Sequence, residues 1–195
     1  RARNLQKAAR RVAEELDGRF PDSFEGLLAL PGVGEYTAGA VASICFDRPC
    51  AAVDGNVLRV LSRFLADDSP RETMKKWAKP ALEAVYPPGQ CGMFTQALME
   101  LGATVCVPNG APRCGECPLC DLCRAHALGK EGDFPQKPVK KPRPREELTV
   151  FLLDCGGKLA LRKRPDKGLL AGLWELPWVP GTLSPEEAAA QAARW

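Results

Sequence analysis

The chain has 195 residues, enough for one large or two small domains with a buried core, which excludes a short binding peptide. Lys and Arg number 27 against 24 Asp and Glu, and a net charge of +3 does not by itself indicate nucleic-acid binding. Although 45% of the residues are hydrophobic, no uncharged apolar run reaches about 18 residues and no signal sequence opens the chain, which predicts a soluble, intracellular protein. The chain begins at Arg1 rather than Met and ends in a helical pattern at Trp195, and we interpret it as a segment of a longer protein.

Helical periodicity dominates the first hundred residues. An apolar stripe runs through the first predicted helix, and Gly18 is placed to end it. Asp22 and Glu25 have the spacing of a capping box, which predicts a short second helix. The third is rich in small residues that allow close helix contact. The predicted helices span residues 3–16, 23–29, 36–46, 57–65, 70–86 and 93–103.

The composition changes after residue 132. Proline alternates with Lys and Arg over 133–147, which is typical of an extended basic linker. Strand-like runs at 148–153 and 158–163 then flank a turn ending in Gly156 and Gly157, which indicates a hairpin. A second domain is therefore expected from residue 148.

The unit over residues 23–46 combines a short helix, a Pro-Gly-Val-Gly turn and a second helix. Gly32 and Gly34 let the backbone turn sharply and let amide N–H groups at a helix start approach a phosphate oxygen. Such a unit binds a DNA backbone without reading bases. The alternative is a plain helix corner whose glycines serve only the turn.

Asp54 and Asn56 stand at the expected start of the helix that follows. A carboxylate in this position is commonly an N-cap. A buried, ionised carboxylate near a sugar is also what glycosidic cleavage requires, because the transition state carries positive charge. Both roles are compatible with one side chain.

Nine cysteines are present, and five of them lie between residues 106 and 123. An odd number concentrated in one loop without a secretion signal favours metal binding in a reducing compartment over disulfides. A zinc ribbon needs a longer arm between its two Cys pairs, so an iron-sulfur cluster is favoured, and four ligands leave one cysteine spare. We expect the four scattered cysteines to be small buried hydrophobic residues: Cys45, Cys50, Cys91 and Cys155.

Three motifs together resemble one known family. Residues 30–38 read Leu-Pro-Gly-Val-Gly-Glu-Tyr-Thr-Ala, residues 53–57 read Val-Asp-Gly-Asn-Val, and the cysteine loop follows. This combination resembles the iron-sulfur branch of the helix-hairpin-helix DNA glycosylases. Endonuclease III relatives have a nucleophilic Lys at the position of Tyr36. They have Asp-Thr-His-Val at the position of residues 54–57, which read Asp-Gly-Asn-Val here. In both respects the chain resembles the MutY-type adenine DNA glycosylases instead.

The resemblance extends to the end of the chain, because residues 161–165 and 168–177 are similar to the opening of that family's nudix-like domain. It implies a mainly α fold followed by the start of an α+β domain. The expected first domain is a partial helical glycosylase domain over 1–132, which contains the helix-hairpin-helix at 23–46 and the iron-sulfur loop at 106–123. A linker over 133–147 and a nudix-like segment over 148–195 are expected to follow it.

The implied reaction is hydrolysis of the N-glycosidic bond of adenine mispaired with 8-oxoguanine or guanine in double-stranded DNA, after the adenine is flipped out. Asp54 would stabilise the cationic sugar, Asn56 would orient Asp54 or the water, and Tyr36 would line the pocket. Because Tyr36 replaces the lysine, strand scission is not expected. Phosphate contacts would come from Gly32, Val33 and Gly34.

The family's cysteine spacing assigns the four ligands of a [4Fe–4S] cluster to Cys106, Cys114, Cys117 and Cys123 and leaves Cys120 spare. The first interval is seven residues here where six is usual, which makes Cys120 a candidate substitute for Cys106. The only histidine, His126, is expected to be a solvated helix residue.

Family members also carry a catalytic Glu on a helix upstream of the hairpin, for which this sequence has no counterpart, so the segment alone is expected to be inactive. The parent protein is expected to be a monomer in the bacterial cytoplasm, associated with the nucleoid. The rival interpretations are a non-catalytic iron-sulfur DNA-binding module, an endonuclease III-like glycosylase or lyase, a zinc-dependent regulator and, least favoured, a nudix hydrolase.

Overall fold

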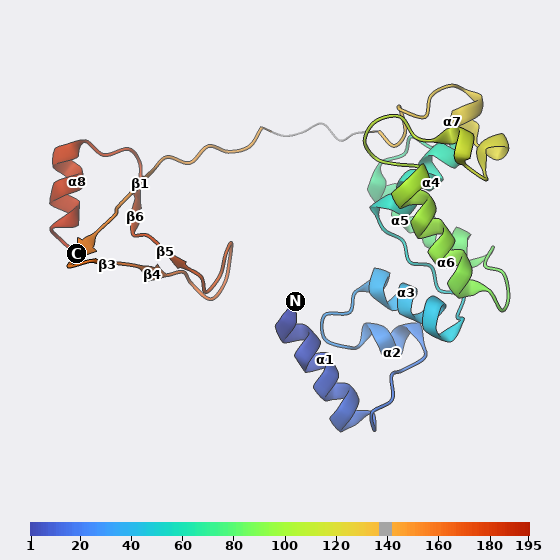
Figure 1. The fold of residues 1–195 in the computed structure, drawn as a ribbon, viewed down its shortest axis with the longest axis horizontal. Coiled ribbons are helices and arrows are strands. Elements are labelled where there is room, and N and C mark those ends of the chain that lie inside the picture. Colours follow the sequence, from blue (N-terminus) through green and yellow to red (C-terminus); the bar gives the residue numbers. More distant parts are fainter. Residues whose placement is uncertain (137–141) are drawn as a thin grey trace. The chain divides into compact units, whose positions relative to one another are not determined.

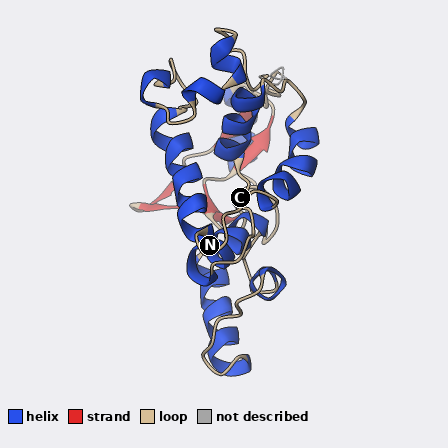
Figure 2. Cartoon of the chain, turned by 90° about the vertical axis from the view of Figure 1, so that its right-hand side faces the viewer, coloured by secondary structure: helices blue, strands red, loops and turns tan. Residues whose placement is uncertain are grey.

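The computed structural model describes residues 1–136 and 142–195 and divides into two compact units, Arg1–Pro138 and Val139–Trp195. Figure 1 traces the chain in sequence colours, and Figure 2 colours its helices and strands. The strands of the described residues all follow residue 147. The middle of the linker expected over 133–147 lies outside the described residues. In the described part of the chain, no helix is both long and apolar enough to cross a membrane.

Helices make up the regular structure of the first unit. The α-helices are α1 (Ala2–Glu15), α2 (Phe24–Leu28), α3 (Glu35–Phe46), α4 (Gly55–Leu65), α5 (Arg71–Glu83), α6 (Cys91–Glu100) and α7 (Arg124–Ala127). A π-helical turn, η1 (Leu101–Val105), extends α6, and two 3₁₀ turns, η2 (Cys114–Glu116) and η3 (Cys120–Leu122), form the cysteine loop. The predicted helices are therefore present, with ends that differ by a few residues.

The first three helices share a small hydrophobic core. Val12 of α1 is buried against α2 and α3, and residues Asp17 and Gly18 adopt positive φ angles of 51° and 73° that end α1. The cap of α2 differs from the prediction, because the Ser23 side chain accepts the N–H of Gly26 at 3.2 Å. Asp22 instead pairs with Arg48, so the expected Asp22–Glu25 capping box was wrong by one residue.

Close packing of α3 depends on its small residues. A Cβ added at Gly39 would lie 2.5 Å from the carbonyl oxygen of Ala51. The segment that leads to α4 therefore packs directly on the backbone of α3. Ser43 of α3, Thr95 of α6 and Tyr86 form a buried chain of hydroxyl hydrogen bonds of 2.8–2.9 Å. These contacts fix α3 and α6 side by side and hold the start of α4 beside α3.

Over its described residues, 142–195, the second unit consists of three two-stranded antiparallel pairs and one helix. The strands are β1 (Leu148–Val150), β2 (Asp154–Cys155), β3 (Lys158–Leu159), β4 (Arg162–Lys163), β5 (Trp174–Glu175) and β6 (Trp178–Pro180), followed by α8 (Pro185–Ala192). A hairpin forms between β2 and β3 around Gly156 and Gly157, so Asp154 and Cys155, which were expected in the turn, are strand residues. The run expected to form the first strand of this hairpin contains β1, which in the described residues pairs with β6.

The scattered cysteines do not share one environment. Cys91 is buried and Cys50 half-buried, as expected of small hydrophobic residues. Cys45 and Cys155 are exposed, so the prediction was wrong for these two. Cys45 lies in α3 and Cys155 in β2.

Candidate functional site: the hairpin, the α4 cap and the cysteine loop

The turn between α2 and α3 has the backbone that a phosphate contact needs. Gly34 is extended at the N-cap of α3 and exposed, and a Cβ added there would meet no atom within 4 Å. Within the described residues, no acceptor is found for the N–H of Gly32 or Gly34, whereas Val33 donates its N–H to Leu30 at 3.1 Å. The two glycine amides are therefore the groups of this turn that are free to bind an anion at the start of α3.

The two glycines give a matched pair for testing this turn. Gly32 has a φ of +81°, and an added Cβ would lie 2.6 Å from Cβ of Asn4. We expect Gly32→Ala to lower the free energy of unfolding by about 1–3 kcal/mol. Gly34→Ala should cost less than about 1 kcal/mol and mainly weaken binding to duplex DNA. Urea unfolding and a DNA titration of both variants check this, and equal unfolding free energies would contradict it.

Asp54 caps α4. Its Oδ1 accepts the backbone N–H groups of Asn56 and Val57 at 2.8 and 2.9 Å, and its Oδ2 accepts the Asn56 side-chain amide at 2.9 Å. The carboxylate is half-buried. The N-cap role is thus present in the structure, and the same three donors also hold the carboxylate in one orientation.

Tyr36 connects the hairpin to this cap, since it lies two residues after Gly34 on α3. Partial burial raises the pKa of Tyr36, and the negative charge of nearby Asp54 raises it further. Its side chain is 40% exposed, and its hydroxyl lies 3.8 Å from the sulfur of Met99. The phenol therefore remains protonated at neutral pH close to the Asp54 carboxylate. The structure thus joins the predicted residues Asp54 and Asn56 by hydrogen bonds, and Tyr36 lies near enough for the charge of Asp54 to act on its phenol.

A buried arginine that sequence reasoning missed supports this cap. Arg59, one turn further along α4, is only 7% exposed and donates to Asn56 Oδ1 at 3.0 Å. It also donates to the carbonyls of Gly102 at 2.6 Å and Cys106 at 2.9 Å. Burial lowers the pKa of Arg59, whereas the nearby Cys106 and Asp54 act in the opposite direction and raise it. The cysteine loop is thereby linked through Arg59 and Asn56 to Asp54.

The five cysteines of the loop line one cavity. It is bounded by α4, η1 and the loop itself, and its cysteines are all half-buried: Cys106, Cys114, Cys117, Cys120 and Cys123. A second buried arginine, Arg63, donates to Cys106 Sγ at 3.3 Å, and a cation in this position favours a thiolate. The donor set is made of soft sulfur ligands of the kind that hold an iron-sulfur cluster, and Arg63 places a positive charge beside one of them, Cys106.

The spacing of the sulfur atoms argues against a single zinc ion held by four cysteines. Four thiolates around one tetrahedral zinc lie about 3.8 Å apart, given Zn–S bonds of about 2.3 Å. Among the described residues, no three cysteine sulfurs lie within 4.8 Å of one another. Three mixed ligand atoms, from Cys114, His126 and Glu131, do lie within that distance of one another.

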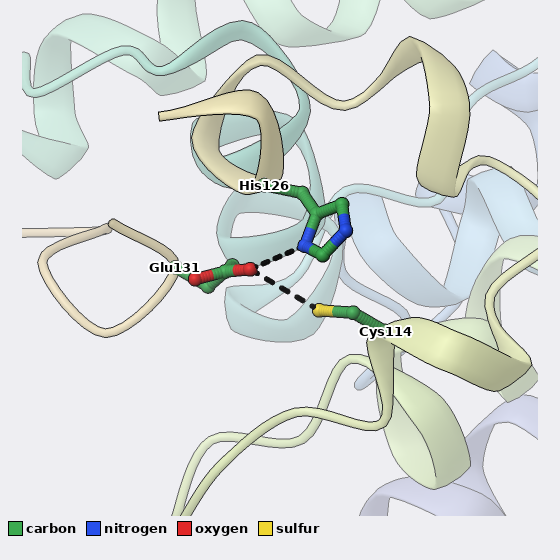
Figure 3. Close-up of side chains that lie close together, drawn as sticks. All are labelled: Cys114, His126 and Glu131. Carbon is green, nitrogen blue, oxygen red and sulfur yellow. Dashed lines mark hydrogen bonds and ion pairs between the residues drawn. The ribbon is translucent and has the colours of Figure 1, made fainter. Parts of the chain in front are cut away.

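Two further side chains reach this cavity, as Figure 3 shows. His126 of α7 is exposed, as expected, but its Nδ1 pairs with Glu131, and the Cys114 thiol donates to the same carboxylate at 3.7 Å. Burial raises the pKa of Cys114 to about 11, and Glu131 adds to this. No sequence signal pointed to Glu131, because it follows the last cysteine in a polar loop.

Comparisons with known proteins agree with this geometry. The family description "Helix-hairpin-helix motif" matches residues 15–44. The chain is 41% identical to a mouse adenine DNA glycosylase over 96% of the chain and 45% of that protein, and 42% identical to one from Arabidopsis thaliana over 92% and 31%. The human adenine DNA glycosylase is 37% identical over 100% of the chain and 45% of that protein.

Solved structures show the same helical fold. A thermostable thymine-DNA glycosylase matches with a TM-score of 0.58 and 32% identity over 65% of this chain and 58% of that one. A trapped endonuclease III–DNA covalent intermediate matches with a TM-score of 0.53 and 31% identity over 66% and 59%. The chain spans about half, or less, of the length of the adenine DNA glycosylases that it matches. Over that span it is a homologue of the adenine DNA glycosylases, with a helix-hairpin-helix, endonuclease III-like fold.

Proposed function

We propose that the protein is a DNA repair glycosylase that hydrolyses the N-glycosidic bond of adenine mispaired with 8-oxoguanine or guanine. The observation that carries this proposal is the Asp54 carboxylate, which three N–H donors hold in one orientation at the start of α4. The likeness to adenine DNA glycosylases over nearly the whole chain supports it.

In this proposal, the free amides of Gly32 and Gly34 bind a phosphate of the duplex and fix its position relative to α3. The glycosidic electron pair leaves with adenine, which takes up a proton, and a water molecule adds to the anomeric carbon and loses one. Asp54 stabilises the positive charge that develops on the sugar between these events. Asn56 holds the carboxylate in place, and the Tyr36 hydroxyl lines the same side of the pocket.

The cysteine loop would hold a [4Fe–4S] cluster through Cys106, Cys114, Cys117 and Cys123. When bound, the cluster supplies iron–thiolate bonds that cross-link the loop, and redox chemistry is not needed for the hydrolysis. Arg59, which donates to the Cys106 carbonyl and to Asn56 Oδ1, would then connect the loop to Asn56. We further infer that residues 148–195 begin a nudix-like domain.

The test uses the full-length protein, because this chain covers about half of its relatives. It is incubated with duplex DNA in which adenine faces 8-oxoguanine, and the product is treated with alkali. We expect strand cleavage at the adenine only after alkali, and no product trapped by borohydride, because no lysine stands at position 36. A borohydride-trapped complex would favour a lyase, and binding of the duplex without any base release would favour a non-catalytic DNA-binding module.

A further inference from the structure

Four ligands suffice for the proposed cluster, yet five thiols line its cavity, and the proposed function gives Cys120 no role. Cys120 is half-buried and begins η3. A bystander thiol is expected to point away from the cluster, whereas Cys120 borders the same cavity as the four assigned ligands. Its position therefore requires an explanation.

The backbone explains why Cys120 faces the cavity. Hydrogen bonds between residues three apart run from Cys117 N–H to the Cys114 carbonyl at 3.0 Å, from Cys120 to Cys117 at 3.1 Å, and from Cys123 to Cys120 at 3.1 Å. The segment is a series of short turns and not one helix, because Cys117 and Cys123 at the ends of η2 and η3 have extended backbone. These successive turns bring the four thiols of residues 114–123 to the border of the one cavity.

Cys106 belongs to a different part of the structure. It follows η1, and its carbonyl and sulfur are held by the α4 side chains Arg59 and Arg63. The seven residues between Cys106 and Cys114 separate it from the other four thiols. Losing the Cys106 sulfur therefore leaves the arrangement of residues 114–123 in place.

We infer that Cys120 is a reserve ligand, which takes the iron coordination position of Cys106 when Cys106 is lost or displaced. In the exchange the Cys120 thiol gives its proton to solvent and its sulfur bonds to iron, while the released Cys106 thiolate takes up a proton. The iron oxidation state does not change. This inference rests on the proposed cluster but is independent of glycosylase activity.

The test compares Cys106→Ala, Cys120→Ala and the double variant in the full-length protein, with Cys155→Ala as a control in the second unit. Alanine is chosen because it offers no ligand atom. Iron and sulfide per chain and the visible absorption are measured after identical reconstitution. We expect Cys106→Ala to keep at least half of the wild-type cluster content. The cluster content of the double variant should fall at least tenfold, and that of Cys120→Ala and Cys155→Ala should stay close to wild type.

Alkylation followed by mass spectrometry provides a second measurement. In cluster-loaded wild type we expect Cys120 to be labelled, and in cluster-loaded Cys106→Ala we expect it to be protected. Loss of the cluster in Cys106→Ala equal to that in the double variant, or loss in Cys120→Ala alone, would overturn the reserve role. If wild type holds no iron, the cofactor assignment itself fails, which is a separate result.

Discussion

Asp54→Asn is expected to abolish adenine release by the full-length protein while leaving its fold and its affinity for duplex DNA nearly unchanged. Asparagine caps helices about as well as aspartate, so the N–H groups of Asn56 and Val57 keep an acceptor and α4 keeps its cap. The substitution removes the negative charge and also the acceptor of the Asn56 side-chain amide, because Oδ2 becomes an NH2 donor. If that charge stabilises a cationic sugar, single-turnover base release should fall by at least about 100-fold.

Asp54→Ala distinguishes the helix-cap role of Asp54 from the role of its charge. It removes both the charge and the cap, so we expect the same loss of base release together with a loss of about 0.5–2 kcal/mol in the free energy of unfolding. Single-turnover kinetics and urea unfolding of both variants provide the measurement. Base release by Asp54→Asn close to that of wild type would reduce Asp54 to a helix cap.

Arg59→Met is expected to have the largest effect on stability. Methionine has a similar length but no donor, so three buried or half-buried acceptors lose their partner: Asn56 Oδ1 and the carbonyls of Gly102 and Cys106. Each unsatisfied acceptor costs about 1–3 kcal/mol, which predicts a loss of about 3 kcal/mol or more. Because Asn56 would no longer be held, base release per folded molecule should fall as well.

Arg48→Met is the matched control for this experiment. Arg48 pairs with Asp22 at the surface, with both side chains more than half exposed, and such a pair contributes about 0–1 kcal/mol. Urea unfolding of both variants, with base release measured under conditions where each is folded, checks the prediction. A loss in Arg59→Met no larger than that in Arg48→Met would show that the bridge between the cysteine loop and the cap contributes nothing.

The sequence predicted the local features of the site well because local signals encode them. The glycine turn, the cap at Asp54 and the three-residue spacing of the last four cysteines are each set by neighbouring residues. The Asp22 capping prediction missed by one residue because Ser23, an equally good cap, stands next to it.

The sequence did not reveal the contacts that connect these features. Arg59 donates to carbonyls 43 and 47 residues away, and Arg63 to Phe134, 71 residues away. No local pattern encodes such partners. A usable signal was nevertheless present, because two arginines one turn apart interrupt the apolar face of α4 and must therefore be buried with acceptors. The pairing of β1 with β6 was missed for the same reason.

If Asp54 stabilises a positive charge on the sugar, the protein should bind a charged sugar analogue at the adenine position more tightly than an uncharged one. Two duplexes are compared, and in both the position of the adenine faces 8-oxoguanine. One duplex carries a cationic azasugar at that position, and the other carries an uncharged abasic analogue. We predict that the full-length protein binds the cationic duplex at least about 100-fold more tightly and that Asp54→Asn removes most of this difference. An equal preference for the cationic duplex in wild type and Asp54→Asn would contradict the claim.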